Sequence, residues 1–379
     1  MSPAPEAPLA KVMKTLSDWD SSLRDPPSSQ RRLLEQLLEG YAKTEYGEIH
    51  SATSIDSVEE YRKRFPAVRY VEVEPWLKRV REEDFKVFLY EEPLTWVMTR
   101  GTTGRSKVIP VTPRHLQDIV RCGSRAVLNF SIRQGGLELL AGGVLNLQFP
   151  SNTETMRTGE REIVYGFSSG TYAKLNPMMA GLSLVPRQEE IDALKTGLTE
   201  ADWEHRYEYI YQVAKDKEIV SIIGVAPVQT GFARYLKRKH GIYPRELWQL
   251  KVIYSTSVAK IQTRYASRLK AMYGDAPVVE MYTATEGAFG QQRDELPYIV
   301  PNYDAYLFEV RTGDGVKMLH ELERGEWGRL IVSTSILPRY ELADLVEGMG
   351  KNYFRVFGRD RPEVVLEHLL YRTLYRWFL

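Results

Sequence analysis

A regular alternation of strand and helix patterns limits the folds that the second half of this 379-residue chain can adopt. Residues 219–225 form a continuous apolar run, which is expected of a strand that is covered on both faces. Around it, helical patterns over 200–217, 229–239 and 260–273 alternate with strand patterns over 250–254 and 278–282. Because parallel strands need a crossover connection, this alternation predicts a parallel sheet that is covered by helices.

The patterns on either side of this region complete the expected organisation. Further helices are expected over 33–41, over 57–64 and beyond Pro113, and further strands over 94–99 and 144–149. The later part of the chain changes character, with strand patterns joined by turns over 298–311, 329–334 and 353–357. We therefore expect an α/β body with helix-covered sheets and an attached β-rich subdomain.

Composition excludes several classes of protein. The 51 basic and 50 acidic residues leave a net charge of +1, without the basic excess on which general nucleic-acid binding depends. A single cysteine, Cys122, excludes an internal disulfide framework and a cysteine-based zinc site. No apolar stretch is long enough to span a membrane, and the first residues do not resemble a signal peptide. We expect a cytoplasmic protein that binds no nucleic acid.

The strongest chemical signal runs from Thr99 to Lys107, directly after a predicted strand. Its sequence, TRGTTGRSK, combines glycines that let the backbone approach a ligand with hydroxyl and amide groups that can donate to phosphate oxygens. Lys107 adds a positive charge. The spacing differs from that of the Walker loop of nucleoside triphosphatases, because Ser106 precedes the lysine and Val108 follows it. The segment therefore predicts a phosphate-binding loop of another fold.

This loop resembles that of the adenylate-forming superfamily, which includes acyl-CoA ligases, luciferases and the adenylation domains of peptide synthetases. The continuation from Lys107 to Thr112 is similar to the acyl-acid amido synthetases known as the auxin-responsive Gretchen Hagen family, in bacterial form. Segments 44–47, 57–62 and 65–66 are also similar to that family. The resemblance implies an adenylate-forming, acyl-CoA synthetase-like large domain over residues 31–358. The proline and alanine content of the first residues predicts a flexible segment over residues 1–30.

A second motif, YTATEG over residues 282–287, follows a predicted buried strand. The ring of Tyr282 can stack on a base, Thr285 can bind a phosphate, and Glu286 can hold Mg²⁺, which favours carboxylate and phosphate oxygens. The resemblance implies much the same roles for these residues.

A third motif covers residues 339–346, where Asp344 can accept hydrogen bonds from both hydroxyls of a ribose. The family usually has glycine where Ala343 stands. Downstream, the segment containing Arg359 resembles the hinge of the family. The Ser255 loop falls by position where the family lines the adenine.

The end of the chain departs from the family pattern. Only 19 residues follow Asp360, where the family carries a domain of roughly a hundred residues, which swings between two half-reactions. We expect residues 359–379 to form a hinge remnant and a C-terminal amphipathic helix. That helix is expected to dock on the body of the protein rather than on a membrane or a partner, through Val365, Leu366, Leu369, Leu370, Leu374, Trp377 and Phe378.

Together the motifs predict an adenylate-forming ligase that activates a carboxylic acid with ATP and Mg²⁺ and passes the acyl group to an amine or a thiol. Lys107, Thr285 and Glu286 are the expected catalytic residues, and Glu286 is the expected metal ligand. The residues expected to bind the nucleotide are Thr99, Gly101, Thr102, Thr103, Gly104, Ser255, Tyr282, Asp344 and Arg359.

Two alternatives remain open from the sequence. Without a mobile C-terminal domain, the chain could be a nucleotide-binding regulatory subunit, or an enzyme whose missing domain comes from a partner protein. Residues 166–170 match the G-x-S-x-G pattern of serine hydrolases around Ser168, but that pattern needs a strand before it and a helix after it. Asn176–Pro177 should soon end any such helix.

Overall fold

The predicted parallel sheet forms the centre of the protein. The structure, a computed structural model, describes residues 6–82, 84–99, 106–158, 161–176 and 182–378. The central sheet has the strand order β11-β10-β9-β8-β7-β3-β6, in which β6, β3, β7, β8 and β9 are parallel and β10 and β11 are antiparallel. These strands are β3 (Gly143–Asn146), β6 (Ser183–Val185), β7 (Ile219–Val225), β8 (Val252–Thr256), β9 (Val278–Ala284), β10 (Gly287–Gln291) and β11 (Val300–Pro301).

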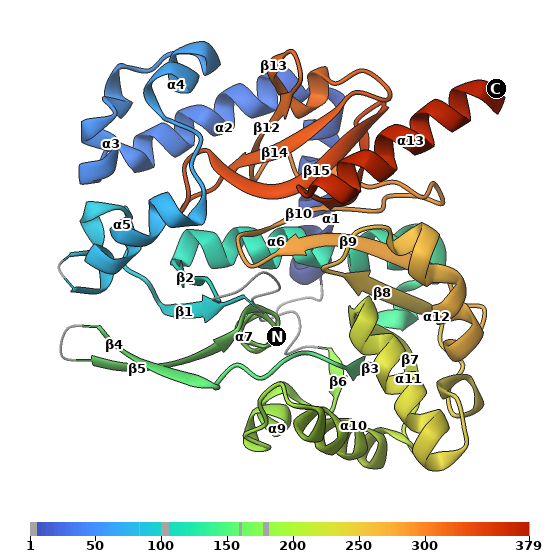
Figure 1. Ribbon diagram of the computed structural model, residues 1–379. Helices are drawn as coiled ribbons and strands as arrows, with labels where there is room; N and C mark the ends of the chain where they lie inside the picture. The colour runs from blue at the N-terminus through green and yellow to red at the C-terminus, as the bar shows by residue number, and fades with distance from the viewer. Residues whose placement is uncertain (1–5, 83, 100–105, 159–160, 177–181, 379) are drawn as a thin grey trace.

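Helices cover both faces of this sheet, as the sequence predicts (Figure 1). Apolar side chains of α10, α11 and α12 pack with β7 and β8 on one face, and those of α6 pack on the other. The predicted alternation is confirmed in the order α10, β7, α11, β8, α12, β9. The helices of the body are α6 (Pro113–Phe130), α7 (Ser168–Leu175), α9 (Gln188–Ala193), α10 (Glu200–Ala214), α11 (Ala226–His240) and α12 (Ala266–Tyr273).

Two further sheets flank the central one. The predicted β-rich subdomain is confirmed as an antiparallel sheet with the order β13-β12-β14-β15-β16. Its strands are β12 (Leu307–Thr312), β13 (Gly315–Met318), β14 (Trp327–Ser333), β15 (Tyr340–Gly350) and β16 (Tyr353–Arg359). The smaller sheet has the order β2-β1-β5-β4, with β1 (Thr95–Met98), β2 (Val108–Val111), β4 (Glu154–Thr158) and β5 (Arg161–Phe167).

Residues 6–24, inside the segment expected to be flexible, form helix α1 (Glu6–Arg24). Trp19 is fully buried, and its indole N–H donates to the carbonyl oxygen of Pro301 at 3.0 Å. The helix is followed by α2 (Pro26–Tyr41), whose Gln30 side chain donates to the carbonyl oxygens of Tyr303 and Tyr306, both at 2.8 Å. These anchors hold the start of the chain against residues 300–308. The shorter helices nearby are α3 (Glu45–Ile49), α4 (Val58–Arg64) and α5 (Tyr70–Glu82).

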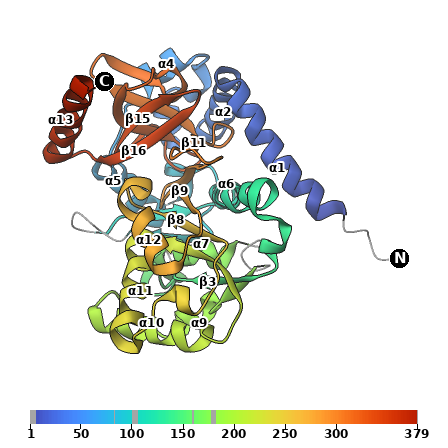
Figure 2. The same cartoon turned by 90° about the vertical axis from the view of Figure 1, so that its right-hand side faces the viewer.

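The predicted C-terminal helix is present as α13 (Pro362–Phe378), but its leucines face outward. Leu366 and Leu370 are 58% and 55% exposed. The helix follows β16 directly in the chain (Figure 2). It rests on that strand through His368, whose ring stacks on Phe357 with centroids 4.0 Å apart. The expectation that the leucine face docks on the body is therefore wrong for these residues. Within the part of the chain that the structure describes, no helix has the length and apolar character that crossing a membrane requires.

Candidate active site

The three sequence motifs meet beside the carboxyl end of the central sheet. The turn after β9 carries Thr285 and Glu286, the base of the β1–β2 loop carries Lys107, and the start of β15 carries Tyr340 and Asp344. Figure 1 shows β9 lying between the sheet that contains β15 and the β1–β2 hairpin. Segments 233 residues apart in sequence thus contribute to one site, as Lys107 and Tyr340 show by their 2.8 Å contact.

Thr99 and Lys107, the described residues at the two ends of the phosphate loop, are joined by a pair of hydrogen bonds. The amide of Lys107 donates to the hydroxyl oxygen of Thr99 at 3.0 Å, and the amide of Thr99 donates to the carbonyl oxygen of Lys107 at 3.0 Å. Such pairing brings the two strands together where the loop leaves the sheet. The predicted ligands Gly101, Thr102, Thr103 and Gly104 lie outside the described residues.

The Lys107 ammonium group lies among groups from other motifs. Its Nζ donates to the hydroxyl of Tyr340 at 2.8 Å and is 3.6 Å from Oε1 of Glu286. The Nζ also lies 5.7 Å and 5.3 Å from the ring centroids of Tyr70 and Tyr340, within the range of cation–π attraction. The Tyr70 hydroxyl in turn accepts from the amide of Val108 at 3.0 Å. This arrangement keeps a partly exposed cation next to a buried carboxylate.

Two side chains of α7 contact the turn that carries Thr285 and Glu286. The hydroxyl groups of Ser168 and Thr285 are 3.0 Å apart, and the Tyr172 hydroxyl donates to the carbonyl oxygen of Thr285 at 2.8 Å. Nε2 of His115, on α6, lies 3.2 Å from the Tyr172 hydroxyl. Both turn residues are buried, so their positions depend on these contacts.

Asp344 is paired on both carboxylate oxygens. Tyr282 donates its hydroxyl to Oδ2 at 2.7 Å, and Nε of Arg359 is 3.1 Å from Oδ1. Burial raises the pKa of the Asp344 carboxyl, although the charge of Arg359 and the hydrogen bond from Tyr282 act in the opposite direction. A ribose that binds here would compete with these two side chains for the same oxygens.

Two of the sequence-predicted nucleotide ligands have other neighbours in this structure. The Tyr282 ring, expected to stack on a base, is buried and packs against Phe289 and Phe354, with centroids 5.6 Å and 6.1 Å away. Ser255, expected to line the adenine, is fully buried, and its hydroxyl donates to Oε1 of Gln229 at 2.5 Å. Their polar groups are engaged within the protein, and their proposed contacts to the nucleotide stay predictions.

The structure also identifies neighbours that sequence reasoning did not single out. Tyr340, Tyr172, Tyr70 and His115 were not among the candidates, although Tyr340 stands inside the third motif. Its position in the motif could have identified it, because Tyr340 and Asp344 both lie near the start of β15 and are therefore close to the same site. The other three come from α5, α6 and α7, and no motif marks them.

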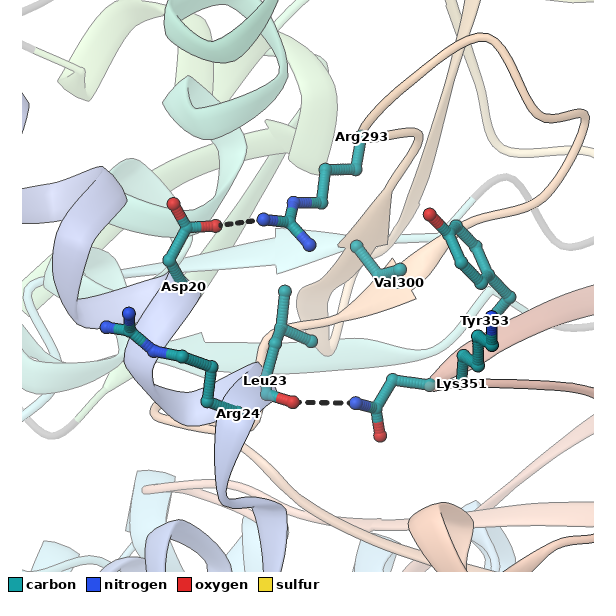
Figure 3. Close-up of a pocket in the computed structure, with 8 residues that line it drawn as sticks. Asp20, Leu23, Arg24, Arg293, Val300, Lys351 and Tyr353 are labelled. Carbon is teal, nitrogen blue, oxygen red and sulfur yellow. Dashed lines mark hydrogen bonds and ion pairs between the residues drawn. The ribbon is translucent and has the colours of Figure 1, made fainter.

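A cavity of about 250 Å³ lies elsewhere, between α1 and the turn from β15 to β16 (Figure 3). Asp20 pairs there with Arg293 at 2.8 Å, and the Asn352 side chain donates to the carbonyl oxygen of Leu23 at 2.7 Å. The remaining lining residues are Arg24, Val300, Lys351 and Tyr353. None of these residues belongs to the three motifs, so the cavity is separate from the candidate site.

The serine-hydrolase alternative has its strand and helix but lacks a base. Helix α7 follows β5 directly, with Ser168 as its first residue, and it ends at Leu175, just before Asn176, where the sequence predicts that the helix should stop. The hydrogen-bond partner of the Ser168 hydroxyl is Thr285, and no histidine within the described residues is hydrogen-bonded to that hydroxyl. The geometry therefore joins Ser168 to the second motif and does not build a triad.

Comparison with known proteins agrees with this architecture. The jasmonoyl–L-amino acid synthetase of Nicotiana attenuata is 20% identical over 419 aligned positions, which cover 93% of this chain and 70% of that protein. A solved acyl acid amido synthetase, GH3.15 in complex with 2,4-DB, superposes with a TM-score of 0.74 at 16% identity, covering 92% of this chain and 70% of that one. An open conformation of 2-hydroxyisobutyryl-CoA ligase, solved with 2-HIB-AMP and CoA, superposes with a TM-score of 0.59 at 14% identity, covering 87% and 74%.

These superpositions confirm the predicted adenylate-forming fold. A family model described as the GH3 family N-terminal domain matches residues 15–210, which is more than half of the chain. The match includes the phosphate loop and both helices that hold the Thr285 turn. The predicted resemblance is thereby confirmed, and the chain belongs to the GH3 family.

Proposed function

We propose that this protein activates a carboxylic acid with ATP and passes the acyl group to an amine. The observation that carries the proposal is the convergence of the three motifs, in which Lys107 Nζ lies 3.6 Å from Glu286 and 2.8 Å from Tyr340 at the start of the strand that bears Asp344. The predicted enzyme class, an adenylate-forming ligase, is confirmed by the family and by relatives named as an amino acid synthetase and a CoA ligase.

In the proposed first step, a carboxylate oxygen of the acid attacks the α-phosphorus of ATP. The bond between the α-phosphorus and the bridging oxygen breaks, pyrophosphate leaves and an acyl-adenylate forms. Such reactions depend mainly on positioning and on stabilisation of negative charge. Lys107 would offset charge on the phosphates, the Thr285 hydroxyl would bind the α-phosphate, and Asp344 would hold the ribose after exchanging its contacts with Tyr282 and Arg359.

The residues present fit a magnesium ion that arrives with the nucleotide. Within the described residues no group of three or more histidine, cysteine, aspartate or glutamate side chains could hold a metal by itself. Mg²⁺ commonly uses one or two carboxylates, substrate phosphates and water, so a single buried carboxylate such as Glu286 suits it. When bound, the ion would neutralise charge on the phosphates.

In the proposed second step, an amine nitrogen attacks the acyl carbon of the adenylate, and AMP leaves as the amide forms. An amine is favoured over a thiol because the two similar proteins that align with more than 90% of this chain are named as a jasmonoyl–L-amino acid synthetase and an acyl acid amido synthetase. The acid and the amine are not specified by the described residues, and a partner protein that would supply a C-terminal domain stays a prediction.

Pyrophosphate exchange tests the first step. Purified protein, ATP, Mg²⁺ and labelled pyrophosphate should produce labelled ATP with at least one member of a panel of aliphatic and aromatic acids. Lys107→Ala and Asp344→Ala should each lower kcat/KM by roughly 10- to 100-fold, since each removes a charged contact of about 1.5–3 kcal/mol. The matched control is Lys270→Ala on α12, which removes an exposed ion pair with Asp275 and should leave exchange unchanged.

The outcomes separate the alternatives. ATP binding without exchange for any acid would favour a regulatory nucleotide-binding subunit. Exchange that is equal in wild type, Lys107→Ala and Asp344→Ala would reject the assigned site. Mass spectrometry of reactions with amino acids or with coenzyme A would then show whether an amide or a thioester forms.

A further inference from the structure

The helix that the hydrolase pattern singled out makes its polar contacts with the second motif. From α7, Ser168 contacts the Thr285 hydroxyl at 3.0 Å, and one helical turn later Tyr172 contacts the Thr285 carbonyl oxygen at 2.8 Å. Residues four apart lie on the same helix face, so one face of α7 contacts both the side chain and the main chain of Thr285. The next residue along the chain is Glu286.

The direction of the hydrogen bonds follows from the single proton of the tyrosine. Because the carbonyl oxygen of Thr285 can only accept, Tyr172 must donate its proton there. The 3.2 Å contact with His115 then requires Nε2 of the imidazole to be the donor. His115 is fully buried, and Nδ1 has no hydrogen-bond partner in the described residues, which suits a neutral ring with its proton on Nε2. The Tyr172 proton is therefore donated to the Thr285 carbonyl oxygen, and His115 donates its own proton to the Tyr172 oxygen.

Close packing fixes the position of α7. A Cβ at Gly170 would lie 1.9 Å from the carbonyl oxygen of Phe149, so the helix approaches that segment too closely for any side chain. The hydroxyl of Thr171 also donates to the carbonyl oxygen of Phe167 at 3.1 Å, which closes the first turn. A side chain that positions a reacting group works only from a fixed base, and α7 supplies one.

We propose that Tyr172 is a positioning residue for the nucleotide site, whose hydroxyl fixes the main chain at Thr285 and so the direction of the Thr285 hydroxyl and the Glu286 carboxylate, with His115 fixing the tyrosine. This inference rests on the proposed function. Neither side chain contacts the phosphates in the proposed reaction, so both act through the turn. Small displacements of groups that bind the transferring phosphoryl group have large effects on rate, because the catalysis is mostly positioning.

The test uses Tyr172→Phe, which removes the hydroxyl and keeps the ring. In pyrophosphate exchange with the best acid of the panel, we expect kcat to fall about tenfold or more, while KM for ATP changes less than threefold. Tyr207→Phe is the matched control, since its hydroxyl is also buried and donates to a main-chain oxygen, that of Val228 at 3.3 Å, on α11. Both variants should lose similar thermal stability, and only Tyr172→Phe should lose kcat.

Two variants of His115 complete the design. His115→Gln can still donate from its amide nitrogen and should keep kcat within about threefold of wild type, whereas His115→Leu should match Tyr172→Phe. The double variant Tyr172→Phe/His115→Leu should lose little more than either single variant, because both residues act on the turn at Thr285 and share the Tyr172 hydroxyl.

Several results would overturn the inference. A Tyr172→Phe protein with wild-type kcat, or one whose loss is matched by Tyr207→Phe, removes the positioning role while the proposed function stands. A wild-type protein without exchange for any acid overturns the proposed function and this inference with it. A His115→Gln protein that is as slow as His115→Leu shows that the ring itself, and not the donated hydrogen bond, is required.

Discussion

Ala343 adopts a backbone conformation that side chains disfavour. Its φ is +60°, in the left-handed region, at the position before Asp344 where the sequence resemblance implies glycine. The carbonyl oxygen of Ala343 accepts from the amide of Asp360 at 2.8 Å, which ties this strained residue to the segment after β16. The strain is thus local to the strand that carries the predicted ribose ligand.

Replacing Ala343 by glycine should relieve this strain. We expect Ala343→Gly to raise the free energy of unfolding by about 0.5–1 kcal/mol, because glycine adopts positive φ without steric cost. The control is Ala271→Gly, at an exposed position in α12, which should lose about 1 kcal/mol of helix propensity. Thermal unfolding of the three proteins checks both signs, and a loss at position 343 would argue against the left-handed conformation.

A second residue-scale prediction concerns Glu280, which is buried in β9. Burial raises the pKa of its carboxyl to about 8 from 4.5. Between these pH values the folded state holds a proton that the unfolded state has released, so the free energy of unfolding falls as pH rises, by at most about 1.4 kcal/mol per pH unit. His115 acts in the opposite direction, because burial lowers its pKa to about 4 from 6.5 and the unfolded state there binds the extra proton.

The effects of Glu280 and His115 on the free energy of unfolding oppose each other below pH 6.5, and above pH 6.5 only that of Glu280 remains. Between pH 6.5 and 8 only Glu280 contributes of the pair, so wild type should lose stability over that range and Glu280→Gln should lose less. Denaturant unfolding at pH 6.5 and 8 measures the difference. Glu295→Gln, at an exposed loop position, is the control and should follow wild type. A slope that is the same in all three proteins would contradict the prediction.

At the scale of elements, α13 shows which face of an amphipathic helix docks. Val364 approaches Gly358 so closely that a Cβ there would lie 2.4 Å from it, and the His368 ring lies on Phe357 and against Trp327, with centroids 4.0 Å and 5.4 Å away. The leucines on the other face gain little burial from the body. Periodicity predicted the helix, but it could not show which face meets the sheet.

Two substitutions in α13 test this orientation. His368→Ala should lower the free energy of unfolding by about 1–2 kcal/mol, because it removes a stacked ring pair. Leu370→Ala, two residues away and more than half exposed, should change it by less than about 0.5 kcal/mol. Calorimetry of both proteins measures the comparison. The reverse ranking would restore the docking through leucines that the sequence suggested.

At the scale of the whole molecule, the first helices pack with the late strands into one unit. The largest apolar core joins residues of α1 and α2 with residues 282–356 of the late strands. Trp19 contributes a fully buried ring, and the Arg125 guanidinium lies 5.8 Å from its centroid. We therefore expect α1 to unfold together with the β-rich subdomain, and not before it.

Trp19→Ala tests this coupling. It should cost about 3–5 kcal/mol, the range for removing a large buried aromatic side chain, and lower the temperature of the main unfolding transition. Met13→Ala, at an exposed position of the same helix, should be close to wild type. A normal main transition in Trp19→Ala, preceded by a separate early loss of helix, would show instead that α1 is an independent appendage.

The sequence by itself determined the fold class, the alternating central elements and the positions of the three motifs. Strong local signals carry this information: the continuous apolar run of β7, the helical periodicity of α10 and α11, and glycine-rich or charged segments at strand ends. Such signals depend on near neighbours in the chain, so they can be read without knowing what packs against them.

The tertiary structure alone decided which side chains surround the motifs. Tyr172 meets Thr285 across 113 residues of sequence, Lys107 meets Tyr340 across 233, and Ser168 of the hydrolase-like pattern contacts Thr285 of the second motif. The same holds for the outward face of α13 and the buried Trp19. These pairings depend on how the sheets and helices pack together over the whole molecule. Segments that are distant in the sequence compete there for burial and for hydrogen bonds, and the local sequence pattern carries no information about which of them will meet.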